Sequence, residues 1–360
     1  MAKPLKVLHV IYALSGGGAE RQLQLLLKNA KNSTTHGVLC VEPRDAELSS
    51  LGAEIFVHQR QGKFDFGLYL TCYKTIKSFQ PDVVHLWLPA VITIPAMLTA
   101  ALLKKSIIFS YRRRMNFFRL LSVLEYIFAL FLVKKVISNN AVSQSTGYYQ
   151  LLYKHKSGVT IANGLDFSVI HKKTDHQVKV DKPINMIFVG RLVQEKNILN
   201  LVRALAGIPK NKQWKLDVFG EGDLQQQTMD LVKQLDLEKN IIFHGFEKSI
   251  YLKLAQSDLL LMPSNTEGMP NVLVEALATT IPVVASNIPS IIDIVSDTGA
   301  VILVESDKVE SITKGIVTYM DHQNTYIENT SIGLRISKKF DVASMSEKYN
   351  EQYNSLLHVD

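Results

Sequence analysis

Two kinds of segment alternate along the chain: short runs of apolar and β-branched residues, and longer stretches whose apolar residues recur every three or four positions. Runs of the first kind cover residues 6–11, 38–42, 54–57, 82–86 and 106–110, and later 185–189, 215–219, 240–243, 258–262 and 282–285. Helical patterns cover 20–29, 69–79, 198–205, a stretch that ends at 235, and 271–279. Strands that alternate with helices favour parallel sheets covered on both faces, so we predict an α/β protein.

The alternation starts again in the second half of the chain, although no sequence repeat relates the two halves. Asn163-Gly164 is a turn signal near the middle, and a polar, lysine-rich stretch follows it. We therefore expect one α/β domain over residues 1–165 and another over 166–340. The tail over 341–360 has apolar side chains at four-residue spacing, which predicts a helix.

The composition narrows the class of protein. The 360 residues are 47% hydrophobic and 20% charged, which is typical of soluble globular proteins with sizeable cores. Two cysteines, Cys40 and Cys72, are too few for a disulfide framework and suit a reducing cytosol. The net charge of +7 leaves nucleic acid, an anionic membrane and an acidic ligand open as partners.

Two apolar stretches could be mistaken for membrane spans. The first, residues 86–103, is interrupted by Pro89 and Pro95, so we expect the end of a strand, a loop and a helix. The second, residues 117–133, contains charged residues and fits either a core helix or an interfacial helix. Basic residues gather between positions 100 and 140, which indicates either a solvated face or a surface for an anionic membrane or ligand.

Two glutamates flank the start of the predicted helix at 271–279. Glu267 lies in the loop before the helix, and Glu275 lies one turn inside it. Pro270 suits the start of a helix, where unpaired amides attract an anion such as phosphate. The two carboxylates could bind hydroxyl groups of two sugars. Each also has an ordinary explanation, because Ser264 and Glu267 match a capping box and Glu275 could be solvated.

Further polar and glycine residues follow other predicted strands. Arg191 and Lys196 follow the strand at 185–189 and suit a diphosphate, although an ordinary surface pair is the alternative. Gly16-Gly17-Gly18 follows the first strand and precedes a helix, where backbone can approach a ligand. Because ligands of open α/β sheets bind beyond the carboxyl ends of strands, we expect these features to line one cleft.

Other catalytic signatures are missing from the sequence. It contains no G-x-S-x-G, P-loop, H-E-x-x-H or C-x-x-C pattern, and no G-x-G-x-x-G fingerprint follows the first strand. It also has no Asp-x-Asp pair for a nucleotide-bound metal, and its ten histidines show no metal-ligand spacing. We therefore expect a metal-independent protein without a cofactor.

Taken together, these residues resemble the family-four retaining glycosyltransferases, also called glycosyl transferases group 1. The segment EGMPNVLVEALA at 267–278, followed by PVVAS at 282–286, is similar to the donor motif of that family. Gly190-Arg191-Leu192 with Lys196 resembles its G-R-L…K segment, and IANGLD at 161–166 resembles its interdomain segment. GGGAER at 16–21 resembles a loop found in a subset that acts in bacterial polysaccharide assembly.

The resemblance implies the GT-B fold, in which two Rossmann-like domains face each other across a cleft. Residues 1–165 would then form the acceptor side and residues 166–340 the nucleotide-sugar donor side. The tail over 341–360 resembles a terminal helix that crosses back to the first domain.

The resemblance also assigns roles to residues. Glu275 would bind the ribose hydroxyls of the nucleotide, and Glu267 the hydroxyls of the transferred sugar. Arg191 and Lys196 would stabilise the leaving diphosphate without a metal, so they form the expected catalytic set together with Glu267. The remaining donor-binding residues would be Gly17, Gly18, Phe246, Met269, Pro270, Asn271, Val272 and Leu273.

The acceptor side departs from the family pattern. Many members carry a histidine two positions after His85, and this chain has Trp87 there. The resemblance makes His85 and Arg112 the acceptor-side candidates, because Arg112, after the strand at 106–110, aligns with a polar position near the acceptor cleft of related enzymes. A purely structural role is the alternative for His85.

The function implied by the resemblance is that of a retaining hexosyltransferase. It would move a sugar from a nucleotide sugar, expected to be a UDP-sugar, to a glycan or lipid-linked acceptor of lipopolysaccharide or capsule. We expect a cytoplasmic protein in peripheral contact with the inner face of an anionic membrane, without a nucleic acid partner. Two alternatives stay open: another GT-B reaction such as epimerisation, and a non-catalytic subunit that binds nucleotides or glycans.

Overall fold

The computed structural model describes most of the chain in thirteen ranges and leaves short gaps between them. These ranges are residues 4–14, 18–30, 33–42, 52–60, 62, 65–88, 90–112, 120–140, 148–156, 158–170, 182–247, 249–295 and 299–357, without the side chains at 120–122 and 148–150. The chain divides into two compact units. Unit 1 comprises Met1–Gly164 and Val342–Asp360, and unit 2 comprises Leu165–Asp341.

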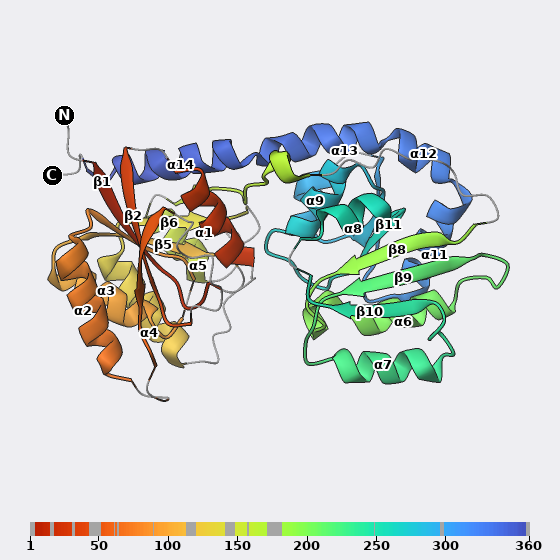
Figure 1. Ribbon diagram of the computed structural model, residues 1–360, viewed down its shortest axis with the longest axis horizontal. Helices are drawn as coiled ribbons and strands as arrows, with labels where there is room; N and C mark the ends of the chain where they lie inside the picture. Colours follow the sequence, from red (N-terminus) through yellow and green to blue (C-terminus); the bar gives the residue numbers. More distant parts are fainter. Residues whose placement is uncertain are drawn as a thin grey trace. The chain divides into compact units, whose positions relative to one another are not determined.

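Unit 1 is built on a parallel sheet with the strand order β3-β2-β1-β4-β5-β6-β7 (Figure 1). Each neighbouring pair runs parallel, as expected when helices connect successive strands. The strands are β1 (Leu5–Val10), β2 (Thr34–Cys40), β3 (Ala53–Val57), β4 (Val83–Leu86), β5 (Ser106–Tyr111), β6 (Lys135–Ser138) and β7 (Val159–Thr160).

Helices cover both faces of the unit 1 sheet, and each face has its own apolar core (Figure 1). The first core lies under α2 (Gly67–Phe79), α3 (Thr93–Leu102), α4 (Leu120–Leu132) and α5 (Tyr148–His155). The second lies under α1 (Gly18–Lys28) and α14 (Val342–Asn354). Tyr349 and Tyr353 of α14 are buried in this second core, so the tail of the chain completes the first unit.

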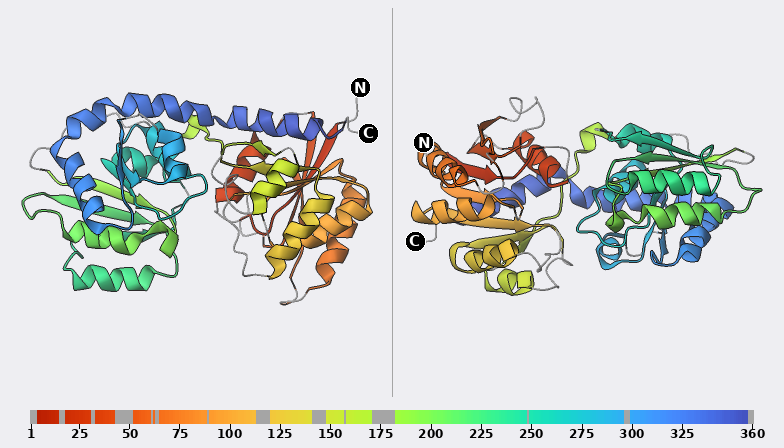
Figure 2. Two further views of the ribbon diagram at one scale, coloured as in Figure 1. Left: turned by 180° about the vertical axis from the view of Figure 1, so that it is seen from behind. Right: turned by 90° about the horizontal axis from the view of Figure 1, so that it is seen from below.

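Unit 2 contains a second parallel sheet, with the order β10-β9-β8-β11-β12-β13 (Figure 1). Helices again lie on both faces, as Figure 2 shows from two further directions. The strands are β8 (Ile184–Val189), β9 (Trp214–Phe219), β10 (Ile241–Gly245), β11 (Leu259–Met262), β12 (Val283–Ser286) and β13 (Val301–Val304). The helices are α6 (Ile198–Ala206), α7 (Gln225–Gln234), α8 (Tyr251–Gln256), α9 (Asn271–Thr279), α10 (Pro289–Val295), α11 (Val309–Asp321), α12 (Gln323–Glu328) and α13 (Thr330–Ser337).

The proline-interrupted stretch at 86–103 forms the end of β4, a loop and α3, so the prediction for it is confirmed. The stretch at 117–133 contains the helix α4, which buries Glu125 and exposes part of its apolar surface. Among the described residues, no helix combines the length and the apolar character needed to cross a membrane.

The segments that connect the two units are anchored near Gly164. The side chain of Gln22 on α1 binds both backbone groups of Gly164, accepting from its amide at 2.6 Å and donating to its carbonyl at 3.0 Å. A Cβ on Gly164 would lie 2.9 Å from the Cα of Val342, so glycine is required for the two segments to approach this closely. On the unit 2 side, Leu165 donates its amide to the carbonyl of Phe340 at 2.6 Å.

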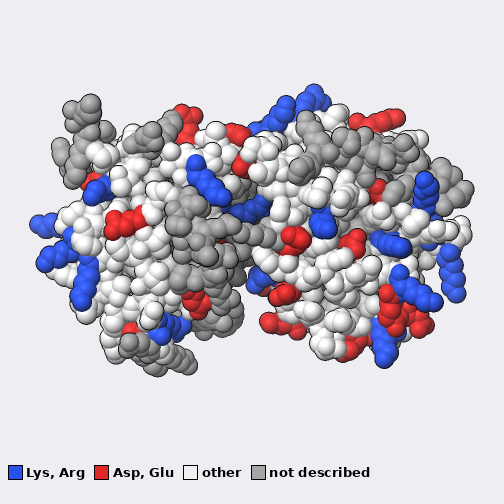
Figure 3. All heavy atoms as spheres, viewed as in Figure 1, with Lys and Arg blue, Asp and Glu red and all other residues white. Residues whose placement is uncertain are grey.

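Basic and acidic side chains are intermingled on the visible face of each unit (Figure 3). The net charge of +7 therefore does not gather into one basic patch on this face. The predicted basic clusters at Arg113-Arg114, Arg119 and Lys172-Lys173 lie outside the described residues.

Candidate functional site

The turn after β8 carries the two cations expected to bind a diphosphate. Arg191 follows the strand and is exposed, and Lys196 ends a short 3-10 helix over Gln194–Lys196. Asn197 then adopts a left-handed conformation with φ of 58°, which asparagine tolerates better than most residues. This turn ends the 3-10 helix and starts α6 at Ile198.

Hydrogen bonds from Asn197 also connect this turn to the segment that follows β11. The buried side-chain amide of Asn197 donates to the carbonyl of Pro263 at 3.0 Å and to that of Ser306 at 2.7 Å. In addition, Asn265 donates its amide to the carbonyl of Glu195 at 2.8 Å. The sequence analysis missed Asn197, although its position directly after Lys196 was a usable signal.

These contacts bring Lys196 and Glu267 together. The ammonium Nζ lies 2.5 Å from the carboxylate Oε1, and the side chains are 21% and 9% exposed. Both residues follow carboxyl ends of neighbouring strands, β8 and β11, where open α/β sheets bind ligands. A charged pair this close to solvent can exchange one partner for an anionic or hydroxylated ligand.

Glu275, the second carboxylate of the predicted site, lies one turn inside helix α9. The helix begins at Asn271 after Pro270, so Ser264 is not its N-cap and the capping-box explanation is wrong. Glu275 is 3% exposed, which also excludes the solvated alternative. Glu275 is therefore a buried carboxylate within an otherwise apolar helix.

The residues before and in the first turn of α9 form a compact segment. Pro270 and Val272 are buried, whereas Met269 and Asn271 are half-buried. Leu273 is one of the residues at the helix start that are expected to bind the donor. Its backbone amide donates to the carbonyl of Pro270 at 3.1 Å. This backbone hydrogen bond closes the first turn of α9, so the amide of Leu273 already has an acceptor within the protein.

Two glycines after β9 pack against the turn that carries Arg191. A Cβ on Gly220, whose φ is 134°, would lie 2.0 Å from the carbonyl oxygen of Gly190. A Cβ on Gly222 would lie 2.5 Å from that of Leu192, so both positions need glycine for backbone packing. Phe246, expected near the base, follows β10 and is exposed.

The glycine loop of unit 1 is only partly described. Gly18 is the exposed first residue of α1, and Gly17 lies outside the described residues. The other two candidates of unit 1, His85 and Arg112, lie at the carboxyl end of the sheet, in β4 and directly after β5.

His85 is fully buried. Its Nδ1 lies 2.8 Å from the hydroxyl of Tyr353, and its Nε2 lies 2.7 Å from that of Ser110. Burial, together with the positive charge of Arg112, lowers the pKa of His85 well below its usual value. Its two partners are side chains of the same unit, so His85 contributes to the attachment of α14.

Arg112 is also held inside unit 1. It donates from Nη1 to Asn163 Oδ1 at 2.6 Å and from Nη2 to the hydroxyl of Tyr349 at 2.9 Å. Its guanidinium carbon lies 4.7 Å from the ring centre of Trp87. Trp87 stands where many members of the family that the sequence resembles have a histidine. Its ring face packs against the guanidinium of Arg112.

The indole of Trp87 also starts a chain of buried hydrogen bonds. It donates to Nδ1 of His9 at 2.9 Å, and Nε2 of His9 lies 2.9 Å from Nδ1 of His36. Because an indole only donates, His9 accepts at Nδ1, carries its proton on Nε2 and donates to His36. Burial is the main cause that lowers the pKa of both histidines, and it lowers that of His36 to about 4.

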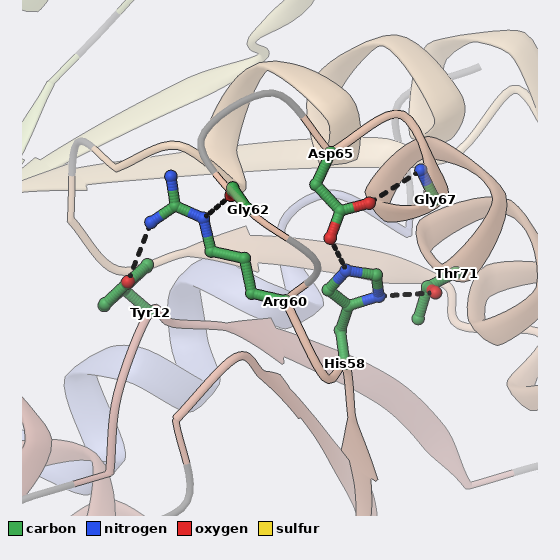
Figure 4. A network of polar contacts seen from close by, with 7 residues as sticks. All are labelled: Tyr12, His58, Arg60, Gly62, Asp65, Gly67 and Thr71. Atoms are coloured by element: carbon green, nitrogen blue, oxygen red, sulfur yellow. Dashed lines mark hydrogen bonds and ion pairs between the residues drawn. The ribbon is translucent and has the colours of Figure 1, made fainter.

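A further polar network lies beyond β3 (Figure 4). Nε2 of His58 lies 2.9 Å from Oδ2 of Asp65, and its Nδ1 lies 2.8 Å from the hydroxyl of Thr71 on α2. Arg60 reaches the hydroxyl of Tyr12 at 3.2 Å and so joins the segments that follow β3 and β1. This network was not predicted from the sequence, although the polar residues that follow β1 and β3 were a usable signal for it.

Within the ranges that the structure describes, no three histidine, cysteine or carboxylate side chains are grouped to hold a metal ion. The absence of a cofactor stays a prediction. Of the expected donor-side residues, the structure brings Lys196 and Glu267 into contact, and it places Glu275 one turn inside α9, eight residues after Glu267 in the chain.

Comparison with known proteins identifies the unit that carries this pair. Residues 170–331 match the family described as Glycosyl transferases group 1. A Campylobacter jejuni N-acetylgalactosaminyltransferase that acts on a diphospho-undecaprenol-linked sugar is 31% identical over 160 residues, 44% of this chain. The chain spans less than half of that relative's length, 43%.

Two further comparisons extend over both units. The capsular polysaccharide biosynthesis glycosyltransferase CapH of Staphylococcus aureus is 26% identical over 308 residues, which are 79% of this chain and 82% of CapH. The crystal structure of Anabaena HepE with UDP and glucose has a TM-score of 0.85 at 19% identity, covering 98% of this chain and 100% of HepE.

The HepE likeness confirms the predicted fold class, with two Rossmann-like parallel-sheet units of the GT-B type. The cleft between the units stays a prediction. The CapH relative confirms the expected similarity to glycosyltransferases of bacterial polysaccharide biosynthesis. Residues 170–331, which include Lys196, Glu267 and Glu275, match the glycosyl transferases group 1 family, and this match covers less than half of the chain.

Proposed function

We propose that this protein transfers a hexose-type sugar, with retention of configuration, from a UDP-sugar to a glycan or lipid-linked acceptor of a cell-surface polysaccharide. The observation that carries the proposal is the contact between Lys196 and Glu267, and the buried Glu275 follows in the first turns of α9. The ammonium suits the diphosphate, and carboxylates suit the hydroxyls of the two sugars in the donor. HepE, which has the same fold, is seen with UDP and glucose, and this supports the choice of donor.

In the proposed reaction the sugar leaves a diphosphate on which negative charge develops. Lys196 and Arg191 stabilise that charge, because preplaced cations favour the transition state over the ground state. Glu267 positions the sugar, and Glu275 holds the nucleotide ribose. The acceptor binds on unit 1, whose carboxyl edge carries the polar networks around Arg112 and His58.

Incubation of the full chain with a panel of nucleotide sugars tests this proposal. We expect slow release of UDP from one UDP-sugar, measured by chromatography, and retention of the anomeric configuration once an acceptor is supplied. Release of nucleotide from none of the donors, together with UDP binding, would favour a non-catalytic binding subunit. A changed sugar on an intact donor would instead indicate epimerisation.

We also propose that unit 1 rests peripherally on an anionic membrane at its cytoplasmic face. Helix α4 exposes Leu124, Ile127 and Phe131, which are spaced for one stripe, and Phe131 is 80% exposed. Lys134 follows the end of α4 and is exposed, as is Lys104 after the neighbouring α3. An apolar stripe bordered by lysines matches the boundary between lipid tails and anionic headgroups.

A further inference from the structure

The guanidinium of Arg112 is a buried cation without a negatively charged partner. The residue is 9% exposed, and no described carboxylate lies within ion-pair distance of it. Its contacts are neutral: the amide oxygen of Asn163, the hydroxyl of Tyr349 and the ring of Trp87. Burial of an unpaired charge costs free energy, and an anion bound to the guanidinium would reduce that cost.

The donors of Arg112 are only partly used. A guanidinium has five N–H groups in a rigid fork, and two of them bind Asn163 and Tyr349. The Nε is buried without a hydrogen-bond partner among the described residues. An oxygen pair such as that of a phosphate or carboxylate is the ligand that this fork fits best.

The position of Arg112 favours a ligand of the protein over a purely structural role. It directly follows β5, at the carboxyl edge of the unit 1 sheet, where ligands of open α/β sheets bind. Asn163, Tyr349 and Trp87 fix the orientation of the fork in advance.

We propose that Arg112 forms an anion site on unit 1 that binds a phosphate group of the acceptor. The identification of the anion with the acceptor rests on the proposed function, in which unit 2 binds the donor. The acceptor is then a phosphorylated molecule, either a free sugar phosphate or a phosphate carried by a lipid, and Arg112 holds that phosphate at the carboxyl edge of β5.

Calorimetric titration of the full chain with UDP at saturation tests the site, because UDP fills the phosphate subsite of unit 2. The probes are inorganic phosphate, farnesyl phosphate in detergent micelles, and farnesol as the neutral lipid control. We expect phosphate or farnesyl phosphate to bind, and Arg112→Gln to weaken that binding about ten-fold or more. Binding of farnesyl phosphate alone assigns the phosphate to a lipid, whereas binding of inorganic phosphate assigns it to a free one.

Two variants separate anion binding from a structural role. Tyr319→Phe removes a buried hydrogen bond to the carbonyl of Asp258 in unit 2, so it should lower the melting temperature but keep phosphate affinity within about two-fold. Arg112→Lys keeps the charge without the fork and should bind phosphate several-fold more weakly. Unchanged affinity in Arg112→Lys and Arg112→Gln, or no binding of either anion by the native chain, overturns the site. Failure of UDP itself to bind would instead count against the proposed function.

Discussion

The ammonium of Lys196 lies 2.5 Å from the carboxylate of Glu267, although 71 residues separate them in the chain. The cation expected to meet the leaving diphosphate is thus paired in advance with the carboxylate expected to meet the sugar. Substrate binding has to share or exchange these partners, so changes at the two positions should affect nucleotide binding in different ways.

Lys196→Ala should weaken UDP binding by about 1–3 kcal/mol, the contribution of a charge-assisted hydrogen bond to a phosphate. Glu267→Gln should leave UDP affinity intact and reduce sugar transfer, because it frees the ammonium and loses a sugar contact. Calorimetry with UDP measures the first effect and a transfer assay the second. Lys233→Ala, an exposed lysine of α7, is the matched control. Equal UDP affinity in the Lys196 variant and the native chain would remove the diphosphate role.

Glu275→Gln should also weaken UDP binding by about 1–3 kcal/mol, because the amide keeps the shape of the carboxylate but accepts ribose hydrogen bonds less strongly. The substitution is isosteric, so the buried site should keep its packing. The comparison of UDP with 2′-deoxy-UDP, which lacks only one ribose hydroxyl, isolates recognition of the ribose. Glu310→Gln on the exposed side of α11 should match the native chain in both titrations.

Unit 1 should lose stability in mild acid. Burial lowers the pKa of His36 from 6.5 to about 4. Between pH 6.5 and pH 4, His36 is therefore protonated in the unfolded chain and neutral in the folded chain. The free energy of unfolding therefore has its full value above pH 6.5, and it falls by about 3 kcal/mol as the pH drops to 4. His9 and His85 add to the same trend. Urea unfolding at several pH values measures the slope.

His36→Gln should flatten this slope by the share that belongs to His36. The exposed His322 provides the control, and His322→Gln should leave the slope as it is. An identical pH dependence in the His36 variant and the native chain would show that the buried histidines do not set acid stability.

Glu125 should produce the opposite trend. Burial raises the pKa of this carboxyl to about 7 against contributions from Thr93 and the Ala90 amide, so the folded chain keeps a proton that the unfolded chain releases above 4.5. Stability therefore falls as the pH rises from 4.5 to 7, again by about 3 kcal/mol. Glu125→Gln mimics the protonated form and should be more stable than the native chain at pH 8. A less stable variant at that pH would mean that the carboxylate is satisfied by its neighbours.

Phe131→Ser should reduce binding to vesicles that contain anionic lipid by about five-fold to thirty-fold, because the exposed ring contributes about 1–2 kcal/mol of apolar burial. Sedimentation with vesicles at low salt measures the bound fraction. Met229→Ser on α7 removes an exposed apolar side chain from unit 2 and should bind like the native chain. Equal sedimentation of all three proteins would exclude α4 as the contact.

Much of the architecture follows from local patterns. The helix at 271–279 has the bounds predicted for it, because Pro270 starts it and its apolar residues recur at helical spacing. By contrast, β13 and α10–α13 were not predicted. The strand β13 is only four residues long, Val301–Val304, and a run of that length carries too little periodicity to identify.

The candidate site was predictable as a set of residues but not as a set of contacts. Glu267 and Lys196 each follow a strand, and that pattern alone placed both at the edge of a sheet. Their direct pairing depends on the left-handed turn at Asn197, which no periodicity reveals. The neutral surroundings of Arg112 depend on Tyr349, 237 residues further along the chain.

The place of α14 in unit 1 has a consequence for synthesis of the chain. One face of the first sheet is covered in part by Tyr349 and Tyr353, which belong to the second core of that unit. A ribosome that has made residues 1–164 has therefore produced a unit with an uncovered apolar face. Unit 1 can close this core only after unit 2 has been translated, so the nascent chain must be kept from aggregating during that interval.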